Sequence, residues 1–506
     1  MSPAISLAAL AVLRTLGYQP PLSVDGIRKA AEQAIGAVPS GHFSLRGVAE
    51  YESLWQSFEM VGDSKFRYTE SVAGILPKFE GFDGRTAWLD GVAGVPHAMS
   101  HSARDLSRII AYVIDGSWAA PDAPLSFKLL GTSPTETSLD VTCLDGGTPV
   151  TLFLDAQSRL PVRLTHWGSD GEDEWTFADY TKEAGWAVPT RITHRGGDEN
   201  ERIVVDSVAV DVGSGPSFGP PRTDDGLAIY DPTISKQLEV KRIGGYLFVH
   251  PKLNGRDEGW FFFDTGADCM VIDSRLAEKY RLPAIGSEFN AGVVATSRMS
   301  ICEGMRFQLG PITLTRPTYY EMDMAPFSAA FGIPVAGICG YDYISRGSFD
   351  IDLGKKTIEV WEPGRAPLPT GAKWVPFTFN SNVPCVPCGF APNHTGFFAV
   401  DTGSGSAVDF CSPAVEKYDM LKGREVVSGY TGGAGGAAES KGGTIEWFEF
   451  AGHRFEHLGA GFQLTKKGAF ASPYFDGNIG EGILRNGRLI LDYRRSRLAF
   501  APGAAH

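Results

Sequence analysis

The fold is decided by the stretch Phe261-Phe262-Phe263-Asp264-Thr265-Gly266-Ala267, which recurs as Phe397-Phe398-Ala399-Val400-Asp401-Thr402-Gly403-Ser404. In both copies a run of large apolar residues leads into Asp-Thr-Gly. The run predicts a buried strand, and the Thr-Gly pair predicts a tight turn. Each aspartate is therefore expected in a turn at the end of a strand, where little water reaches its carboxylate.

The repeat continues beyond the two turns. Each turn is followed by a short helical pattern and then by an apolar-Gly element, Ile338-Cys339-Gly340 in the first copy and Asn478-Ile479-Gly480 in the second. An alternating strand follows each element. Because the same features recur in the same order, the sequence predicts two homologous β-rich lobes, 236–368 and 369–506.

The two aspartates are candidates for an acid–base pair. If the lobes pack about a pseudo-twofold axis, the turns meet and Asp264 faces Asp401. Like charges at that separation cannot both ionise easily, so one proton is shared. One carboxylate then acts as a base toward a water, while the protonated partner polarises a carbonyl. This chemistry needs no metal and no cofactor.

The duplicated motif resembles the aspartic peptidases. Asp264-Thr265-Gly266-Ala267-Asp268 is similar to the retropepsin signature, and Asp401-Thr402-Gly403-Ser404-Gly405 to the form found in pepsin-like second lobes. The resemblance covers about residues 236–503. It implies acid-protease-like β-barrel lobes, a polypeptide substrate, and Asp264 and Asp401 as the catalytic dyad.

The same resemblance implies supporting roles around the dyad. Thr265 and Thr402 would hydrogen-bond across the lobes beneath it, while Asn478 stands where the family has an apolar residue. The residues with an implied supporting role are Thr265, Gly266, Thr402, Gly403, Ser404, Gly340 and Gly480.

Two Gly-rich turns, 289–298 and 428–440, are candidates for the flaps that close over a substrate. Tyr430 is the candidate substrate-binding aromatic, and a solvent-exposed turn residue is the alternative. The glycines of 432–436 lack the following Lys-Ser/Thr of a phosphate-binding loop, so a mobile hairpin tip is expected there.

The region before the lobes follows a different pattern. Residues 1–40 are predicted to be helical, with helices at 5–16 and 24–35. Residues 41–212 alternate as antiparallel strands.

A helix at 100–114 is expected to interrupt these strands, and the Gly/Pro-rich run 213–225 predicts a boundary that makes 213–235 a linker. The predicted class is therefore mainly β: an α+β domain with a curved antiparallel sheet, followed by two pseudo-symmetric lobes.

Residues 45–212 resemble the curved half-barrel of the outer-membrane lipoprotein carriers. The resemblance rests on segments such as Phe66-Arg67-Tyr68-Thr69-Glu70, Leu160-Pro161-Val162 and Phe177-Ala178-Asp179-Tyr180. It implies a groove for a lipid or acyl chain and favours a periplasmic or cell-envelope location, without excluding the cytoplasm. A plain structural or substrate-presenting domain is the alternative.

Composition limits the partners. The chain has 46 Lys and Arg against 59 Asp and Glu, a net charge of −13, and no long basic run offsets the acidic excess. Nucleic acid is therefore not an expected partner, because binding it needs clustered positive charge. No apolar run reaches the roughly 20 residues that span a bilayer. Residues 4–13 resemble the apolar part of an export signal, but Arg14 follows this segment rather than preceding it.

The remaining metal-ligand and thiol patterns predict structural roles. The seven cysteines do not form a disulfide scaffold. Cys385-x-x-Cys388 is expected to hold a local disulfide or two unpaired thiols. The pairs His97/His101 and His453/His457 are expected to be core or surface histidines rather than metal ligands.

The sequence thus predicts an aspartic endopeptidase, a monomer whose two lobes form an intramolecular pseudo-dimer. One alternative is an envelope-associated binding protein with an apolar-ligand groove in 41–212 and non-proteolytic lobes. Another keeps the dyad for a different water- or proton-transfer reaction, since a fold does not fix a function.

Overall fold

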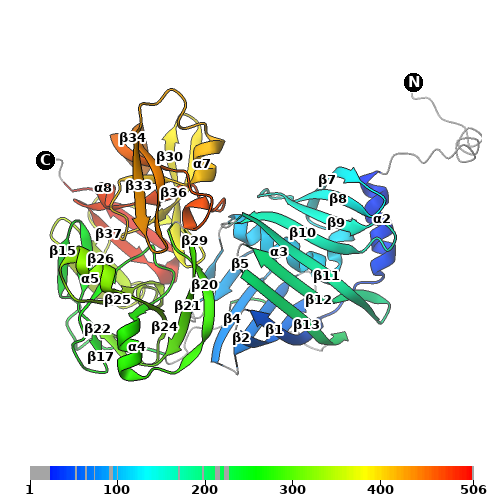
Figure 1. Cartoon of the computed structure of the whole chain (residues 1–506), viewed down its shortest axis with the longest axis horizontal. Helices are drawn as coiled ribbons and strands as arrows, with labels where there is room; N and C mark the ends of the chain where they lie inside the picture. Colours follow the sequence, from blue (N-terminus) through cyan, green and yellow to red (C-terminus); the bar gives the residue numbers. More distant parts are fainter. Residues whose placement is uncertain are drawn as a thin grey trace, which may run out of the picture.

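A computed structural model describes residues 23–503, apart from 52–53, 63–64, 73–74, 91–94, 100, 169–170, 197–198, 211–216, 221–226 and 294. The predicted mainly β class is confirmed: an N-terminal part lies beside two further β-rich bodies (Figure 1). The expected helix at 5–16 and the apolar segment 4–13 lie outside the described residues.

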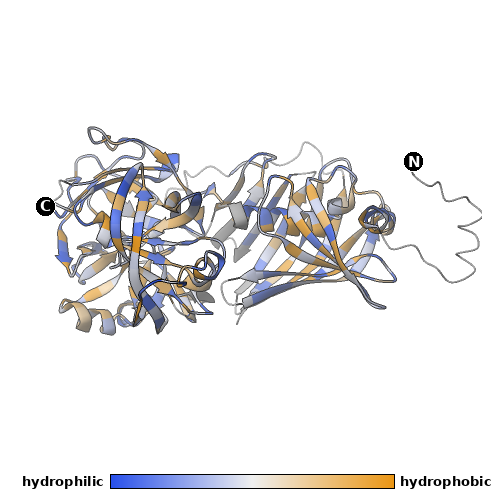
Figure 2. Ribbon diagram, turned by 90° about the horizontal axis from the view of Figure 1, so that it is seen from above, coloured by the Kyte–Doolittle hydropathy of each residue, from blue (hydrophilic) through white to orange (hydrophobic). Residues whose placement is uncertain are grey.

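The N-terminal part is one antiparallel sheet of 13 strands, in the order β6-β5-β4-β3-β2-β1-β13-β12-β11-β10-β9-β8-β7. Its strands alternate buried and more exposed residues, as in β8 and β9, so one face is apolar. Figure 2 shows hydrophobic and hydrophilic residues interspersed along these strands. The strands are β1 (Phe43–Tyr51), β2 (Leu54–Gly62), β3 (Phe66–Val72), β4 (Ile75–Phe82), β5 (Ala87–Asp90), β6 (His97–Ala98), β7 (Leu125–Thr132), β8 (Glu136–Cys143), β9 (Val150–Asp155), β10 (Pro161–Gly168), β11 (Gly171–Glu183), β12 (Trp186–Gly196) and β13 (Glu199–Val210).

Two helices pack on the apolar face of this sheet. Helix α2 (Val24–Ile35) has the predicted bounds, and Ser23 caps it by accepting a hydrogen bond from the backbone N–H of Gly26 at 3.1 Å. Its buried side chains join the core of the sheet, so α2 belongs to this part rather than to a separate helical segment. Helix α3 (His101–Asp115) occupies the interruption predicted at 100–114.

Two described parts of the predicted linker pack against the rest of the protein. Within 213–235, the side chain of Phe218 is only 8% exposed, and its carbonyl oxygen accepts a hydrogen bond from Trp88 Nε1 at 2.8 Å. Further on, β14 (Ala228–Tyr230) pairs with a strand of the first lobe. A single large aromatic side chain is enough to anchor a stretch that otherwise carries turn residues.

The first lobe contains an eight-stranded sheet in the order β15-β16-β18-β25-β19-β24-β21-β20 and a four-stranded sheet in the order β14-β23-β22-β17. Helices α4 (Ser274–Tyr280), α5 (Ala325–Phe331) and α6 (Tyr341–Ile344) connect the strands. The strands are β15 (Val240–Ile243), β16 (Tyr246–Val249), β17 (Lys252–Leu253), β18 (Trp260–Phe263), β19 (Val271–Asp273), β20 (Ala284–Ala291), β21 (Thr296–Glu303), β22 (Phe307–Leu309), β23 (Ile312–Leu314), β24 (Thr318–Met322) and β25 (Val335–Cys339).

The second lobe has a corresponding strand order, β29-β30-β31-β36-β32-β35-β34-β33. In each lobe the strand that leads into Asp-Thr-Gly pairs in parallel with the strand that leads into Gly340 or Gly480. The elements are β29 (Thr378–Asn380), β30 (Val383–Ala391), β31 (His394–Val400), β32 (Val408–Phe410), α7 (Ser412–Lys417), β33 (Val427–Gly433), β34 (Gly436–Phe450), β35 (His453–Gln463), β36 (Gly477–Ile479) and α8 (Glu481–Leu484).

A five-stranded sheet joins the lobes in the order β27-β26-β37-β38-β28. Strand β26 (Ser348–Asp352) pairs with β37 (Arg488–Asp492), so that Phe349 lies opposite Leu491. The edge strands are β27 (Thr357–Trp361), β38 (Arg497–Ala501) and β28 (Val375–Pro376). One apolar core runs through both lobes, which therefore pack against each other within a single chain.

The N-terminal part meets the lobes beside the Gly340 element. His97 Nδ1 lies 2.9 Å from the hydroxyl of Tyr341, and its Nε2 lies 2.9 Å from the carbonyl oxygen of Ser381. The Tyr341 hydroxyl donates to the carbonyl oxygen of Val95 at 2.6 Å. The first residue after Gly340 is therefore held by the N-terminal part.

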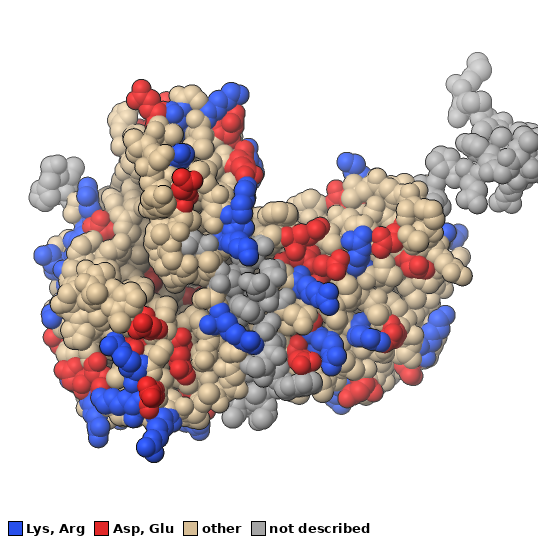
Figure 3. Space-filling model, in the orientation of Figure 1, with Lys and Arg blue, Asp and Glu red and all other residues tan. Residues whose placement is uncertain are grey.

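Other expectations can be placed on this fold. None of the seven cysteines, all of which lie in the described part of the chain, forms a disulfide, so Cys385 and Cys388 on β30 are thiols. His453 and His457 lie on strand β35, where residues four apart are too distant to share a metal. None of the helices in the described ranges is long and apolar enough to cross a membrane. On the face drawn in Figure 3, basic and acidic side chains are interspersed among the described residues, without a continuous basic surface.

Candidate active site

The two Asp-Thr-Gly turns lie at the ends of matching strands. Asp264 follows β18, and its backbone N–H donates to the carbonyl oxygen of Cys339 at 3.1 Å. Asp401 follows β31, and its N–H donates to the carbonyl oxygen of Ile479 at 2.9 Å. The parallel pairing of each turn with the apolar-Gly strand thus fixes the backbone on which each aspartate sits.

Thr265 and Thr402 bind the two turns together through reciprocal hydrogen bonds. The Thr402 N–H donates to Thr265 Oγ1 at 2.9 Å, and the Thr265 N–H donates to Thr402 Oγ1 at 3.1 Å. Thr265 Oγ1 in turn donates to the carbonyl oxygen of Val400 at 2.7 Å, and Thr402 Oγ1 to that of Phe263 at 3.0 Å. Both threonines are buried, so these bonds are shielded from water and hold the turns in register.

The hydrogen bonds between the two threonines bring the carboxyl groups of Asp264 and Asp401 into hydrogen-bonding contact. Each carboxylate accepts a backbone N–H from its own turn, Gly266 to Asp264 Oδ1 at 2.8 Å and Gly403 to Asp401 Oδ1 at 2.7 Å. A Cβ at Gly266 would lie 2.5 Å from Asp401 Oδ1, and one at Gly403 would lie 2.5 Å from Asp264 Oδ1. Both positions need glycine because the opposing carboxylate occupies the space of a side chain.

The environment favours protonation of the pair. Burial raises the pKa of Asp264 above its ordinary value. Burial, followed by the negative charge of Asp264, raises the pKa of Asp401 well above its ordinary value. Two carboxyls in contact cannot both carry a charge cheaply, so the pair holds one proton over a wide pH range.

Gly340 and Gly480 pack against the backbone of the two aspartate turns. A Cβ at Gly340 would lie 2.8 Å from the carbonyl oxygen of Ala267, and one at Gly480 would lie 2.6 Å from that of Ser404. The residues after these glycines donate backbone hydrogen bonds to the same two carbonyls, at 3.1 Å and 2.8 Å respectively. Any larger residue at either position would push the aspartate turn out of place.

Asn478 is the asymmetric feature of the site. Its side-chain Nδ2 donates to Asp401 Oδ2 at 2.8 Å. The matching position in the first lobe is Ile338, which offers Asp264 no hydrogen bond of this kind. The departure from the family pattern at Asn478 thus lies in direct contact with the dyad, a placement that follows from the β31–β36 pairing and was missed by sequence reasoning.

Ser404 links the second turn to the predicted flap. Its hydroxyl donates to Asp409 Oδ2 at 3.4 Å, and Gln463 Nε2 donates both to Asp409 Oδ1 at 3.0 Å and to Thr431 Oγ1 at 2.8 Å. Thr431 lies on β33, next to Tyr430. The side chain of Tyr430 is 78% exposed, so in this conformation the structure places it in solvent and not against the dyad.

The two predicted flap segments form hairpins whose tips touch. Residues 289–298 belong to the β20–β21 hairpin, and 428–440 to the β33–β34 hairpin. The Val293 N–H donates to the carbonyl oxygen of Ala434 at 2.7 Å. The Gly-rich tip 432–436 therefore contacts the hairpin of the other lobe.

Tyr246 is a second residue that sequence reasoning missed. It lies on β16, and its hydroxyl occupies the space beside Gly405, where a Cβ would be 2.6 Å from the oxygen. Burial and then the negative charge of Asp401 raise the pKa of Tyr246. No motif marks it in the sequence, because only the pairing of β16 with β18 brings it next to the second turn.

A comparison with known protein families finds a match to part of this region. The family model described as aspartyl protease matches residues 249–343, which contain Asp264 and Gly340. No curated protein sequence matches the chain.

Solved structures resemble the two parts separately. A retropepsin-like aspartic protease from Rickettsia conorii is 17% identical, with 26% of this chain and 89% of that chain covered and a TM-score of 0.20. An aspartic proteinase from Irpex lacteus is 13% identical, covering 53% and 97% with a TM-score of 0.32. A LolA superfamily protein from Nitrosomonas europaea is 14% identical, covering 40% and 98% with a TM-score of 0.29. Residues 249–343 are thus similar to the aspartyl protease family, and the second Asp-Thr-Gly turn meets this region from the other lobe.

Proposed function

We propose that the protein is an aspartic endopeptidase in which Asp264 and Asp401 activate a water molecule for attack on a peptide bond. The observation that carries the proposal is the pair of Asp-Thr-Gly turns held face to face by the Thr265–Thr402 hydrogen bonds. The match of residues 249–343 to the aspartyl protease family supports the same chemistry.

The mechanism follows from the shared proton. The ionised carboxylate takes a proton from a water held between the two groups, and the protonated partner donates a hydrogen bond to the peptide carbonyl. The attacking oxygen then forms a tetrahedral intermediate. Its breakdown needs a proton on the leaving nitrogen, which the carboxyl that received it from water can supply.

The β20–β21 and β33–β34 hairpins are the proposed flaps. Their contact through Val293 and Ala434 would have to open for a polypeptide to enter and would close again over it. Tyr430 is proposed to fold inward on closure, because it stands next to Thr431, which is tied through Gln463 to the second turn.

The test is cleavage of an unfolded polypeptide between pH 4 and 7 by the full chain, with and without a statine-type inhibitor. Asp264→Asn and Asp401→Asn should each lower the cleavage rate by at least about 100-fold, the scale of a lost acid or base. Asp419→Asn is the matched control, because Asp419 is an exposed aspartate whose backbone φ of 48° asparagine also adopts.

The dyad variants should remain folded by near-ultraviolet circular dichroism, since replacing one of two facing carboxyls with an amide removes repulsion. Cleavage that persists in both folded variants, or that the inhibitor does not slow, would contradict the proposal.

The lipid-binding alternative receives no specific support. The apolar face of the N-terminal sheet is covered by α2 and α3, and its central side chains are fully buried.

A further inference from the structure

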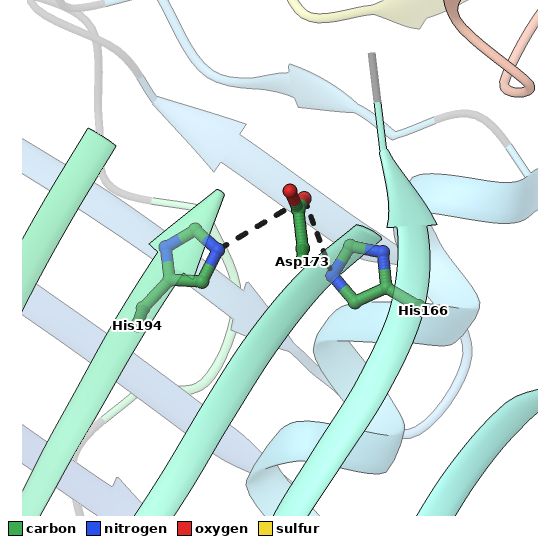
Figure 4. A group of neighbouring side chains, drawn as sticks. All are labelled: His166, Asp173 and His194. Atoms are coloured by element: carbon green, nitrogen blue, oxygen red, sulfur yellow. Dashed lines mark ion pairs between the residues drawn. The ribbon is translucent and has the colours of Figure 1, made fainter. Parts of the chain in front are cut away.

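Three potential metal ligands lie side by side on neighbouring strands of the N-terminal sheet. His166 on β10 is directly opposite Asp173 on β11, and His194 on β12 is opposite Trp175, two residues further along β11. Because side chains alternate along a strand, all three point to the same face (Figure 4). This is the face that carries the buried Leu164, so the cluster lies on the inner side of the sheet.

The three side chains converge on one point. Asp173 Oδ2 lies 3.6 Å from His166 Nε2 and 4.0 Å from His194 Nε2, and Figure 4 shows the carboxylate between the two rings. One ligand atom from each residue falls within 4.8 Å of the others. Two imidazoles and a carboxylate on a tetrahedral Zn²⁺ are separated by roughly 3.4 Å, given bonds of about 2.1 Å. The distances from Asp173 to the two rings would therefore have to shorten by about half an ångström or less to reach this geometry.

The backbone around Asp173 is built to admit its carboxylate. A Cβ at Gly168 on β10 would lie 2.7 Å from Asp173 Cγ, and a Cβ at Gly196 on β12 would lie at the same distance of 2.7 Å. Gly196 is directly opposite Asp173 in the sheet. The carboxylate thus sits in a gap that two glycines on the flanking strands leave open.

The Nε2 nitrogen of His166 is buried and faces the carboxylate of Asp173. The side chain of His166 is 5% exposed, and its Nε2 makes no hydrogen bond to any residue that the structure describes, which is costly for a buried polar atom. The other ring nitrogen, Nδ1, lies 3.1 Å from the hydroxyl of Tyr474. With the proton on Nδ1 and donated to Tyr474, the lone pair of Nε2 is free to bind a cation.

A simple ion pair does not account for the cluster. The distances from Asp173 Oδ2 to the two rings are longer than hydrogen bonds.

The ring of His194 packs against an aromatic neighbour on the adjacent strand. Trp175 stacks on it, with the ring centroids 4.3 Å apart and the planes 14° from parallel.

The other group of potential ligands, Asp105, Cys143 and Asp145, differs in that its carboxylates already have cationic partners. Arg104 and Arg108 already pair with its carboxylates.

We propose that His166, Asp173 and His194 bind one Zn²⁺ ion through the two Nε2 atoms and a carboxylate oxygen, with water completing the coordination. Tyr474 belongs to the second lobe and precedes β36, so it would orient a ligand ring from across the junction. The ion would therefore fasten the N-terminal part to the segment that leads into Asn478. This site is independent of the proposed peptidase activity.

The experiment uses the full chain stripped of metal with a chelator and titrated with Zn²⁺ by calorimetry. The wild type should bind one ion per chain, and Asp173→Asn and His194→Asn should each weaken binding by more than about 100-fold, the upper scale for losing only a supporting group. Tyr474→Phe should weaken binding by about 10-fold while keeping the stoichiometry. His457→Asn is the matched control: it removes an exposed histidine at a backbone φ of 53° that asparagine also adopts.

Cobalt(II) provides a second readout that does not rely on the variants. Bound in place of zinc, it should show visible ligand-field bands without thiolate-to-cobalt charge transfer, because the ligands are nitrogen and oxygen. Charge transfer from a thiolate would place the ion on a cysteine and overturn the proposal. So would the absence of saturable zinc binding, or equal affinity in the wild type and the folded Asp173→Asn and His194→Asn variants.

Discussion

Replacing Asn478 with leucine tests whether its amide controls the protonation of the dyad. The amide donates to Asp401 Oδ2 at 2.8 Å, while Ile338 at the matching position of the first lobe is apolar. A hydrogen bond to a charged group contributes about 1.5–3 kcal/mol. Asp401 is the carboxyl whose pKa is raised further, so it ionises second. Since the amide favours the charged form of Asp401, its loss should raise the upper apparent pKa of the pair by about one to two units.

The assay is the pH profile of kcat/KM on a peptide substrate. The basic limb of Asn478→Leu should move to higher pH by that amount, so activity persists at pH values where the wild-type pair has lost its shared proton. Ile338→Leu is the control, because it changes the matching position without a polar contact. If the variant is too slow to assay, the pH dependence of binding of a statine-type inhibitor reports the same group.

A basic limb that stays in place would show that the amide does not influence the dyad. A shift to lower pH would show that the side-chain oxygen of Asn478 accepts a proton from a neutral Asp401. Either result refutes the reasoning.

Two further predictions concern stability. Thr402→Val keeps the shape of the side chain but removes the hydroxyl, which accepts from the Thr265 N–H and donates to the carbonyl oxygen of Phe263, so urea unfolding should show a loss of about 2–4 kcal/mol. An unchanged midpoint would contradict the role given to the Thr265–Thr402 hydrogen bonds. Burial lowers the pKa of His97 from 6.5 to about 4, so the unfolded chain binds a proton that the folded one does not, and stability should fall by roughly 3 kcal/mol as the pH drops from 6.5 to 4. His97→Gln should remove up to about 1.4 kcal/mol per pH unit from that slope in urea titrations at several pH values, and an identical slope in both proteins would exclude His97 as the cause.

The sequence was most informative where a motif is short and repeated. Asp264 and Asp401 were found because a strand followed by Asp-Thr-Gly constrains both local structure and position, and the structure brings the two side chains together. The helix at 24–35 was predicted with the observed bounds, since its apolar residues follow the helical period and Ser23 precedes them.

Contacts set by sheet pairing could not be found in this way. The contacts of Asn478, of Tyr246 and of the His166 cluster depend on which strands are neighbours and in what register. No local sequence pattern encodes that. The anchoring of Phe218 was missed for a related reason: its partner Trp88 lies in a distant part of the chain. Tyr430 was predicted from the character of its loop alone, and the described conformation leaves it in solvent.

The pairing of β26 with β37 has a consequence for biosynthesis. The first lobe completes its interior only when residues of the second lobe, including Leu491 and the Arg488 that pairs with Asp350, have been synthesised. A nascent chain on the ribosome therefore cannot assemble both aspartate turns until nearly all of these residues have emerged. Under the proposed peptidase function, the paired carboxyl groups would therefore come together only late in synthesis.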